Sequence, residues 1–295
     1  MKDVVKITAL MLFCFLTLFI EQSAILIYSN GNTEGSDAYV FFKSQTDGVS
    51  YDSIGVQIFK PLSFFGFRAY SFAVPFALML ASCAILYVFL DRLDLAFLLA
   101  LIPYFPILME AQAQLLTALL FVIGALLWER KKTWEAFFFF TLTTLCHSYA
   151  SYLVIIWLVA DRLRVIMINR VLIYAYYFLP FVYQGAAALY SITFIYASKL
   201  TLISVSIPLI MNYSERHGGI WAWYFLLSVV ASAFVYVSYG MPYAGIWRLI
   251  MISDFLVPFA MAQEKVRIDN FFLGFIIVGV AMKTAFDIAF AMRLI

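Results

Sequence analysis

Long apolar runs follow one another along most of this chain, separated by short polar turns. A transmembrane helix needs about 20 mostly apolar residues, with a lower limit near 17. Hydrophobic residues make up 65% of the chain and charged residues 12%, whereas a soluble domain holds roughly 45–50% and 25%. The runs AFLLALI and AFFFFTLTTL do not alternate as barrel strands would. We therefore predict an all-α fold, a polytopic bundle of transmembrane helices forming one integral-membrane domain over residues 1–295.

The apolar runs predict about 9–11 membrane segments, because some are long enough for a second pass. The first run continues past Glu21 to Tyr28 without a cleavage pattern, which favours a retained helix over a signal peptide. Pro103 and Pro106 interrupt the region 93–128. The expected spans are residues 5–28, 67–90, 93–108, 112–128, 133–160, 171–211, 220–240, 245–262 and 271–292.

Basic residues predict the orientation, since short loops rich in Lys and Arg stay cytoplasmic. Placing the strongest basic groups inside gives a multi-pass protein of the plasma membrane with a cytoplasmic N-terminus. The polar loop 29–66 is then extracytoplasmic, and it is predicted to contain an amphipathic juxtamembrane segment. The groups are Lys2 and Lys6, Arg130 to Lys132, Arg162, Arg164 and Arg170, and Lys265 and Arg267.

The same rule makes a specific prediction for residues 133–160, because both ends of this run become cytoplasmic. Two short half-passes that meet near Cys146–Tyr149 satisfy the rule and place His147 at the outward tip. Irregular backbone at that depth is tolerated only inside protein or beside a polar cavity. The alternative is one long tilted helix that violates the charge rule.

Polar residues from several separate segments are expected to reach the outer face. Ionisable residues at a membrane are costly to hold, so they are candidates for function. Three cysteines, by contrast, fall inside apolar spans without paired spacing, which indicates neither a disulfide framework nor a metal site. No basic block suggests nucleic acid. The outward candidates are Glu34, Asp37, Glu110, Gln112, Gln114, His147 and Arg248, and the cysteines are Cys14, Cys83 and Cys146.

Three of these candidates suit specific chemistry. Asp37 could take a proton from an attacking hydroxyl or hold a divalent cation, although an aspartate there could also cap a helix. His147 could transfer a proton near pH 7, or it could be a structural histidine satisfied by a hydroxyl such as Thr143. Arg248 is suited to bidentate capture of phosphate, with snorkelling to headgroups as the alternative. For Glu34, a solvated loop position is the simpler interpretation.

Several segments resemble the GT-C superfamily of membrane glycosyltransferases, and within it the EpsG/Wzy-like polysaccharide polymerases. GSDAYVFF is similar to the start of that family's first outer loop, and the run AQAQLLTALL to CHSYASYLV is similar to its helix, basic turn and histidine-bearing helix. WRLIMISDFLVPFAMA resembles its late arginine-bearing helix, and residues 48–66 resemble its juxtamembrane segment. One position differs: the family's Arg-Gln pair is Ala113-Gln114 in this chain.

The resemblance implies transfer of a sugar from a polyprenyl-phosphate or polyprenyl-pyrophosphate donor to a glycan or other hydroxyl acceptor at the outer face. Asp37 would act on the acceptor, and His147 and Arg248 would lie near the donor phosphate. Two other classes stay open from the residues alone. One is a transporter or flippase, although the two halves of the chain show no convincing self-similarity. The other is a non-catalytic subunit of a membrane assembly.

Overall fold

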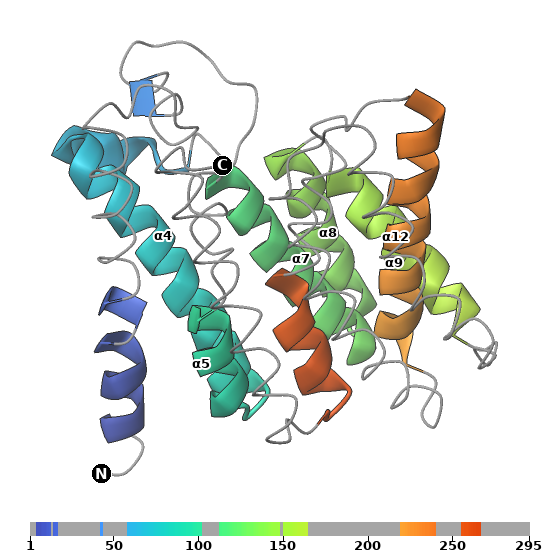
Figure 1. The fold of residues 1–295 in the computed structure, drawn as a ribbon, viewed down its shortest axis with the longest axis horizontal. Helices are drawn as coiled ribbons and strands as arrows, with labels where there is room; N and C mark the ends of the chain where they lie inside the picture. Colours follow the sequence, from blue (N-terminus) through green and yellow to red (C-terminus); the bar gives the residue numbers. More distant parts are fainter. Residues whose placement is uncertain are drawn as a thin grey trace, which may run out of the picture. The chain divides into compact units, whose positions relative to one another are not determined.

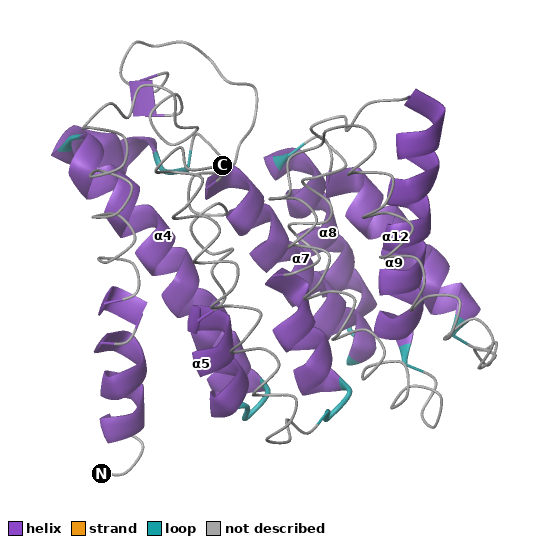
Figure 2. Cartoon of the chain, viewed as in Figure 1, coloured by secondary structure: helices purple, strands orange, loops and turns teal. Residues whose placement is uncertain are grey.

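The computed structural model describes residues 4–12, 14–16, 42–43, 58–101, 112–147, 150–164, 219–239 and 255–266. Every regular element in these ranges is a helix (Figure 2), so the predicted all-α class is confirmed for this part of the chain. The contacts divide the chain into two units. One holds the described residues up to Ser151, and the other holds those from Tyr152 onward.

The described helices overlap the predicted spans, except for a short 3₁₀ helix that precedes the second span. Residues 4–12, 14–16 and 255–263 are also helical. The predicted spans 171–211 and 271–292 lie outside the described residues. The labelled helices of Figure 1 and the short elements beside them are η1 (Lys60–Phe65), α4 (Phe67–Ala84), η2 (Ile85–Phe89), α5 (Leu93–Leu101), α7 (Gln112–Glu129), α8 (Thr133–Cys146), α9 (Ala150–Leu163) and α12 (Ile220–Tyr239).

Helix α4 and the π-helix η2 form one continuous apolar helix. It begins after Gly66, whose φ of 83° is a backbone conformation that glycine adopts at little cost. Pro75 lies inside α4 without ending it. Within the described residues, Phe72–Phe89 is the one helix long and apolar enough to cross a membrane by length and composition, and Gln114–Glu129 is a shorter apolar helix.

Helices α7 and α8 form a hairpin around the basic turn. The turn is closed by Lys131, which adopts a left-handed conformation with φ of 61°. The Lys131 amide donates to the Trp128 carbonyl at 2.9 Å, and the Lys132 amide donates to the Leu127 carbonyl at 2.9 Å. This pair of bonds is a Schellman motif, which satisfies carbonyls left unpaired at a helix end.

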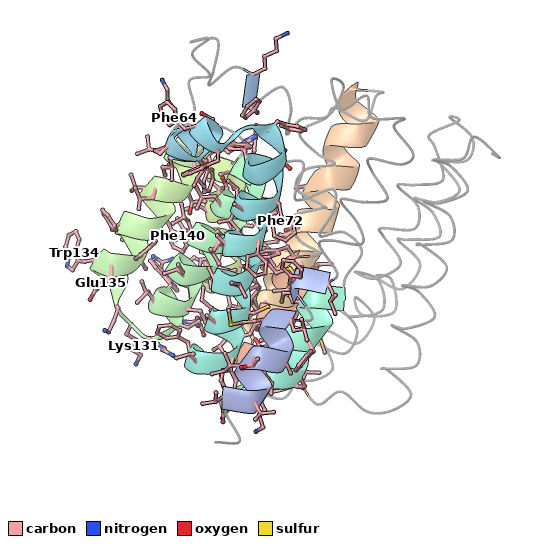
Figure 3. The ribbon with its side chains drawn as sticks, turned by 90° about the vertical axis from the view of Figure 1, so that its left-hand side faces the viewer. Phe64, Phe72, Lys131, Trp134, Glu135 and Phe140 are labelled. Carbon is pink, nitrogen blue, oxygen red and sulfur yellow. The ribbon has the colours of Figure 1, made fainter. Side chains whose placement is uncertain are left out.

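Aromatic rings and one glycine lock the hairpin together near that turn. The ring of Phe140 lies 5.9 Å from Phe121 and 6.2 Å from Trp128, measured between centroids. A Cβ atom on Gly124 would lie only 2.7 Å from the Phe140 ring. The absence of a side chain at Gly124 therefore lets the two helices approach closely. In Figure 3, Phe140 lies between the helices, whereas Trp134 points away from them.

A hydrogen bond to the end of η2 shows which way the hairpin runs along α4, which belongs to the same unit. The Arg130 guanidinium donates to the Phe89 carbonyl at 3.3 Å, so the basic turn lies beside the C-terminal end of η2. Helices α7 and α8 extend from there toward the end where α4 begins at Gly66. Figure 3 shows Phe64 and Lys131 at these opposite ends of the unit.

The N-terminal helix packs against α4. Phe15 makes edge-to-face contacts with Phe72 and Phe76, at centroid distances of 5.3 and 6.2 Å. The Cys14 and Cys83 sulfurs lie 3.9 Å apart, and both side chains are buried. The cysteines are unbridged in this structure, and their spacing in the sequence gave no sign that these two are neighbours.

In the second unit, α9, α12 and the helix at residues 255–263 meet at a cluster of large aromatic side chains. Trp157 lies 4.7 Å from Trp221 and 5.8 Å from Tyr224, measured between ring centroids. The Trp221 indole donates a hydrogen bond to the Gln263 side chain. All three rings are buried. This unit is therefore held by aromatic packing where it is described.

Candidate functional site

The candidate site lies on the contact face of the α7–α8 hairpin, which we call the seam. Residues seven apart on an α-helix point in nearly the same direction, because 3.6 residues complete each turn. The seam residues of α7 are Gln114, Thr117, Phe121 and Gly124, and those of α8 and its end are Ala136, Phe140, Thr143 and His147.

The register of the seam follows from its packed part. Phe121 contacts the ring of Phe140, so one step of seven residues along each antiparallel helix brings Gln114 level with the end of α8, where His147 follows Cys146. A Cβ atom on Gly124 would lie 3.4 Å from the Ala136 carbonyl oxygen. The same step from that pair brings Thr117 level with Thr143. The open end of the hairpin therefore carries four polar residues at two adjacent levels.

Three of these polar residues are buried, and His147 is half-buried. Gln114 is 4% exposed, and both threonines are fully buried. The Thr143 hydroxyl donates to the Phe139 carbonyl at 2.8 Å, but the side-chain oxygen of Gln114 has no hydrogen-bond partner among the residues that the structure describes. A buried polar group without a partner costs about 1–3 kcal/mol. The Gln114 amide is therefore an acceptor poised for a donor from a bound molecule or water.

His147 lies at a break between two helices. Helix α8 ends at Cys146, and His147 is extended, with φ of −157° and ψ of 129°. Its carbonyl accepts a hydrogen bond of 2.9 Å from the amide of Ala150, where α9 begins. The helix is thus interrupted within the predicted region Cys146–Tyr149, where the alternative expected one continuous helix. The two half-passes across the membrane stay a prediction. Each helix has 14 residues, or about 21 Å, less than the ~30 Å hydrocarbon core.

One side chain of the loop 29–66, which is predicted to be extracytoplasmic, is positioned near the start of α4. The ring of Phe42 lies 5.5 Å from Phe67 and 5.7 Å from Tyr70, measured between centroids. Tyr70 is buried, so the contact belongs to the packed part of the first unit. The loop acids Glu34 and Asp37 lie outside the described residues. The site therefore has a described part on the hairpin, and the part predicted for the loop stays a prediction.

Of the other predicted residues, Glu110 and Arg248 lie outside the described residues, and Gln112 is the first residue of α7, with its side chain not described. The structure thus brings Gln114 level with the end of α8, where His147 follows, and leaves the convergence of the rest untested. The described residues contain no group of three or more His, Cys, Asp or Glu side chains able to hold a metal ion. The divalent cation predicted as an option for Asp37 stays an open option.

The sequence reasoning missed Thr117 as a site residue and considered Thr143 only as a partner for His147. The signal was available, because Thr117 lies three residues after Gln114 in an otherwise apolar helix, and that spacing places two polar groups on one face. In comparisons with known proteins, the chain matches no family model, no curated protein and no solved structure.

Proposed function

We propose that this chain is a polytopic plasma-membrane glycosyltransferase or polysaccharide polymerase with a GT-C-like helical bundle. In this proposal the donor is a sugar linked to polyprenyl phosphate or pyrophosphate, and the acceptor is a glycan or another hydroxyl compound. Its partners are thus membrane lipid and these two substrates, with no nucleic acid. The N-terminus is cytoplasmic, and loop 29–66 lies at the outer face.

The observation that carries the proposal is the buried polar end of the seam. An apolar helical hairpin gains nothing in packing from Gln114, Thr117 and Thr143, yet all three are buried there. This end is opposite the basic turn of Lys131, which the charge rule predicts to be cytoplasmic. A buried polar site at the outward end of the helices suits a reaction on an extracytoplasmic substrate.

Phe42 supports a role for the outer loop at the same end, because it packs where α4 begins. Asp37 lies five residues before Phe42, and five residues of chain reach at most about 18 Å. The covalent chain therefore keeps Asp37 within about 18 Å of Phe42, which packs at the start of α4.

The proposed reaction is a displacement at the anomeric carbon. The acceptor oxygen forms the new bond to that carbon while its proton passes to the Asp37 carboxylate. The bond from the anomeric carbon to the phosphate oxygen breaks, and the leaving polyprenyl phosphate keeps the electron pair. Arg248, with His147 nearby, stabilises the negative charge that develops on this group. Gln114 orients the acceptor by accepting a hydrogen bond from one of its hydroxyls.

The test is a transfer assay in membranes that contain the chain and a polyprenyl-pyrophosphate-linked saccharide, with released polyprenyl pyrophosphate as the readout. Asp37→Asn is expected to lower the rate by about 100-fold or more, as loss of a general base does, while expression and membrane insertion stay unchanged. Glu135→Gln is the control, because it removes one exposed carboxylate beside the basic turn. Equal rates for Asp37→Asn and wild type would remove Asp37 from the mechanism.

The break at His147 also favours a second candidate, a transporter or flippase. Transporters often place substrate sites at discontinuous helices, and α8 and α9 are two short helices separated at His147. In proteoliposomes, pH-driven uptake of a labelled saccharide without any lipid-linked sugar would favour this candidate. Release of polyprenyl pyrophosphate without net uptake would favour the transferase.

A further inference from the structure

Two cysteine thiols meet where three helical segments come together. The Cys14 sulfur, on the N-terminal helix, lies 3.9 Å from the Cys83 sulfur on α4. The Cys83 thiol also lies 3.6 Å from the carbonyl oxygen of Ala96 on α5, to which it donates. Both cysteines are buried. The pair is thus held in place by packing from several sides.

The two sulfurs are near van der Waals contact. The two sulfurs need to approach by about 1.9 Å to reach the S–S bond length of roughly 2.05 Å. Rotation about the Cα–Cβ bonds of Cys14 and Cys83 is the motion that the proposal below requires to bring the sulfurs together. The contact between Phe15 and Phe72 keeps the N-terminal helix against α4 while the cysteines turn.

We propose that Cys14 and Cys83 form a site of reversible oxidation that joins the N-terminal helix covalently to α4. The co-reactant is an uncharged, lipid-soluble acceptor of two hydrogen atoms, the class to which membrane quinones belong. One S–S bond forms and two S–H bonds break. The two protons and two electrons pass to the acceptor, which becomes its dihydro form.

The bridge would join the two ends of a long segment of the chain. The two cysteines are 69 positions apart, and the chain between them includes the whole polar loop 29–66. A covalent link between positions far apart in sequence restricts the unfolded chain and holds both ends of the enclosed segment together. The inference does not depend on glycosyl transfer, since it rests only on the position of the two thiols.

The experiment counts thiols in the full-length protein in detergent micelles. The protein is treated with diamide, an uncharged acceptor of two hydrogen atoms, then denatured and alkylated with N-ethylmaleimide. Intact mass after treatment is expected to show one alkylated thiol instead of three, and peptide mapping is expected to find Cys14 joined to Cys83. Dithiothreitol should restore three alkylated thiols.

Three matched variants make the result specific. Cys146→Ser keeps the pair and should still form the bridge, with no alkylated thiol remaining. Cys14→Ser and Cys83→Ser should each keep both of their remaining thiols alkylated. Full alkylation of all three thiols in the treated wild type, or a bridge that uses Cys146, would overturn the proposal and indicate that Cys14 and Cys83 only pack as small apolar side chains.

Discussion

Near the basic turn, the seam between α7 and α8 is filled by Gly124, Ala136 and Phe140, whereas two turns away along the same helices it carries Gln114 and His147. In the first region, every group is apolar and the side chains interlock at van der Waals distance. In the second, Gln114 is buried and His147 is half-buried, and the Gln114 amide oxygen has no partner in the described ranges.

The difference shows how one hairpin can combine a closely packed apolar base with a buried polar end. Close packing at Gly124 fixes the register of the two helices. That register then determines which polar residues lie level with each other at the open end. The apolar region supplies packing that offsets the cost of burying Gln114, whose side-chain oxygen has no partner within the described part of the chain.

The largest expected effect lies in the apolar region. Phe140→Ala removes a buried ring that contacts Phe121 and Trp128, so it should lower the free energy of unfolding by about 3–5 kcal/mol. Phe138→Ala is the matched control, because Phe138 is exposed on the same helix, and its effect should be within about 0.5 kcal/mol. Reversible unfolding in detergent micelles measures both. Equal losses for the two variants would mean that the seam does not hold the hairpin.

A smaller effect of opposite sign is expected at the polar end. Gln114→Leu replaces an amide whose oxygen has no partner with an apolar side chain of similar size, so it should raise the free energy of unfolding by about 1 kcal/mol. The same change should lower the transfer rate if the amide orients the acceptor. Thr117→Val is the comparison: Thr117 takes part in an interaction in the fold, so this variant should lose about 1 kcal/mol.

If Gln114→Leu and Thr117→Val were equally destabilising, Gln114 would be satisfied in the folded protein, and the contrast between the two ends of the seam would fail. A stabilised Gln114→Leu variant with an unchanged transfer rate would keep the contrast but remove Gln114 from the site.

The course of the hairpin could be predicted from the sequence because it depends on local rules. Helix length, the basic turn and the charge rule predicted the helix over 112–128 and the break at His147. The register that brings Gln114 level with the end of α8 could not be predicted, because it depends on how closely Gly124 approaches Phe140. Interhelical register is a property of packing, and the sequence pattern of either helix alone does not contain it.

The contact between Cys14 and Cys83 was out of reach for a related reason. The two residues lie 69 positions apart, and composition places both in apolar spans without saying which spans are neighbours. The predicted convergence of Asp37 and Arg248 with His147 requires the same kind of long-range information. That part of the site remains a prediction to be tested by the transfer assay.

The smallest expected effect concerns the turn that starts the seam. Lys131 has φ of 61°, a conformation that costs a residue with a Cβ atom roughly 1–2 kcal/mol. Lys131→Gly should relieve this strain, and after the greater chain entropy of glycine it should stabilise the hairpin by about 0.5–1 kcal/mol. Lys132→Gly removes the same charge at a residue with φ of −90°, so it should be destabilising. Thermal unfolding of the two variants checks the signs. A lower melting temperature for Lys131→Gly than for wild type would show that the Lys131 side chain stabilises the turn by more than the strain costs. The apolar region of the seam would then depend on the turn as well as on Phe140.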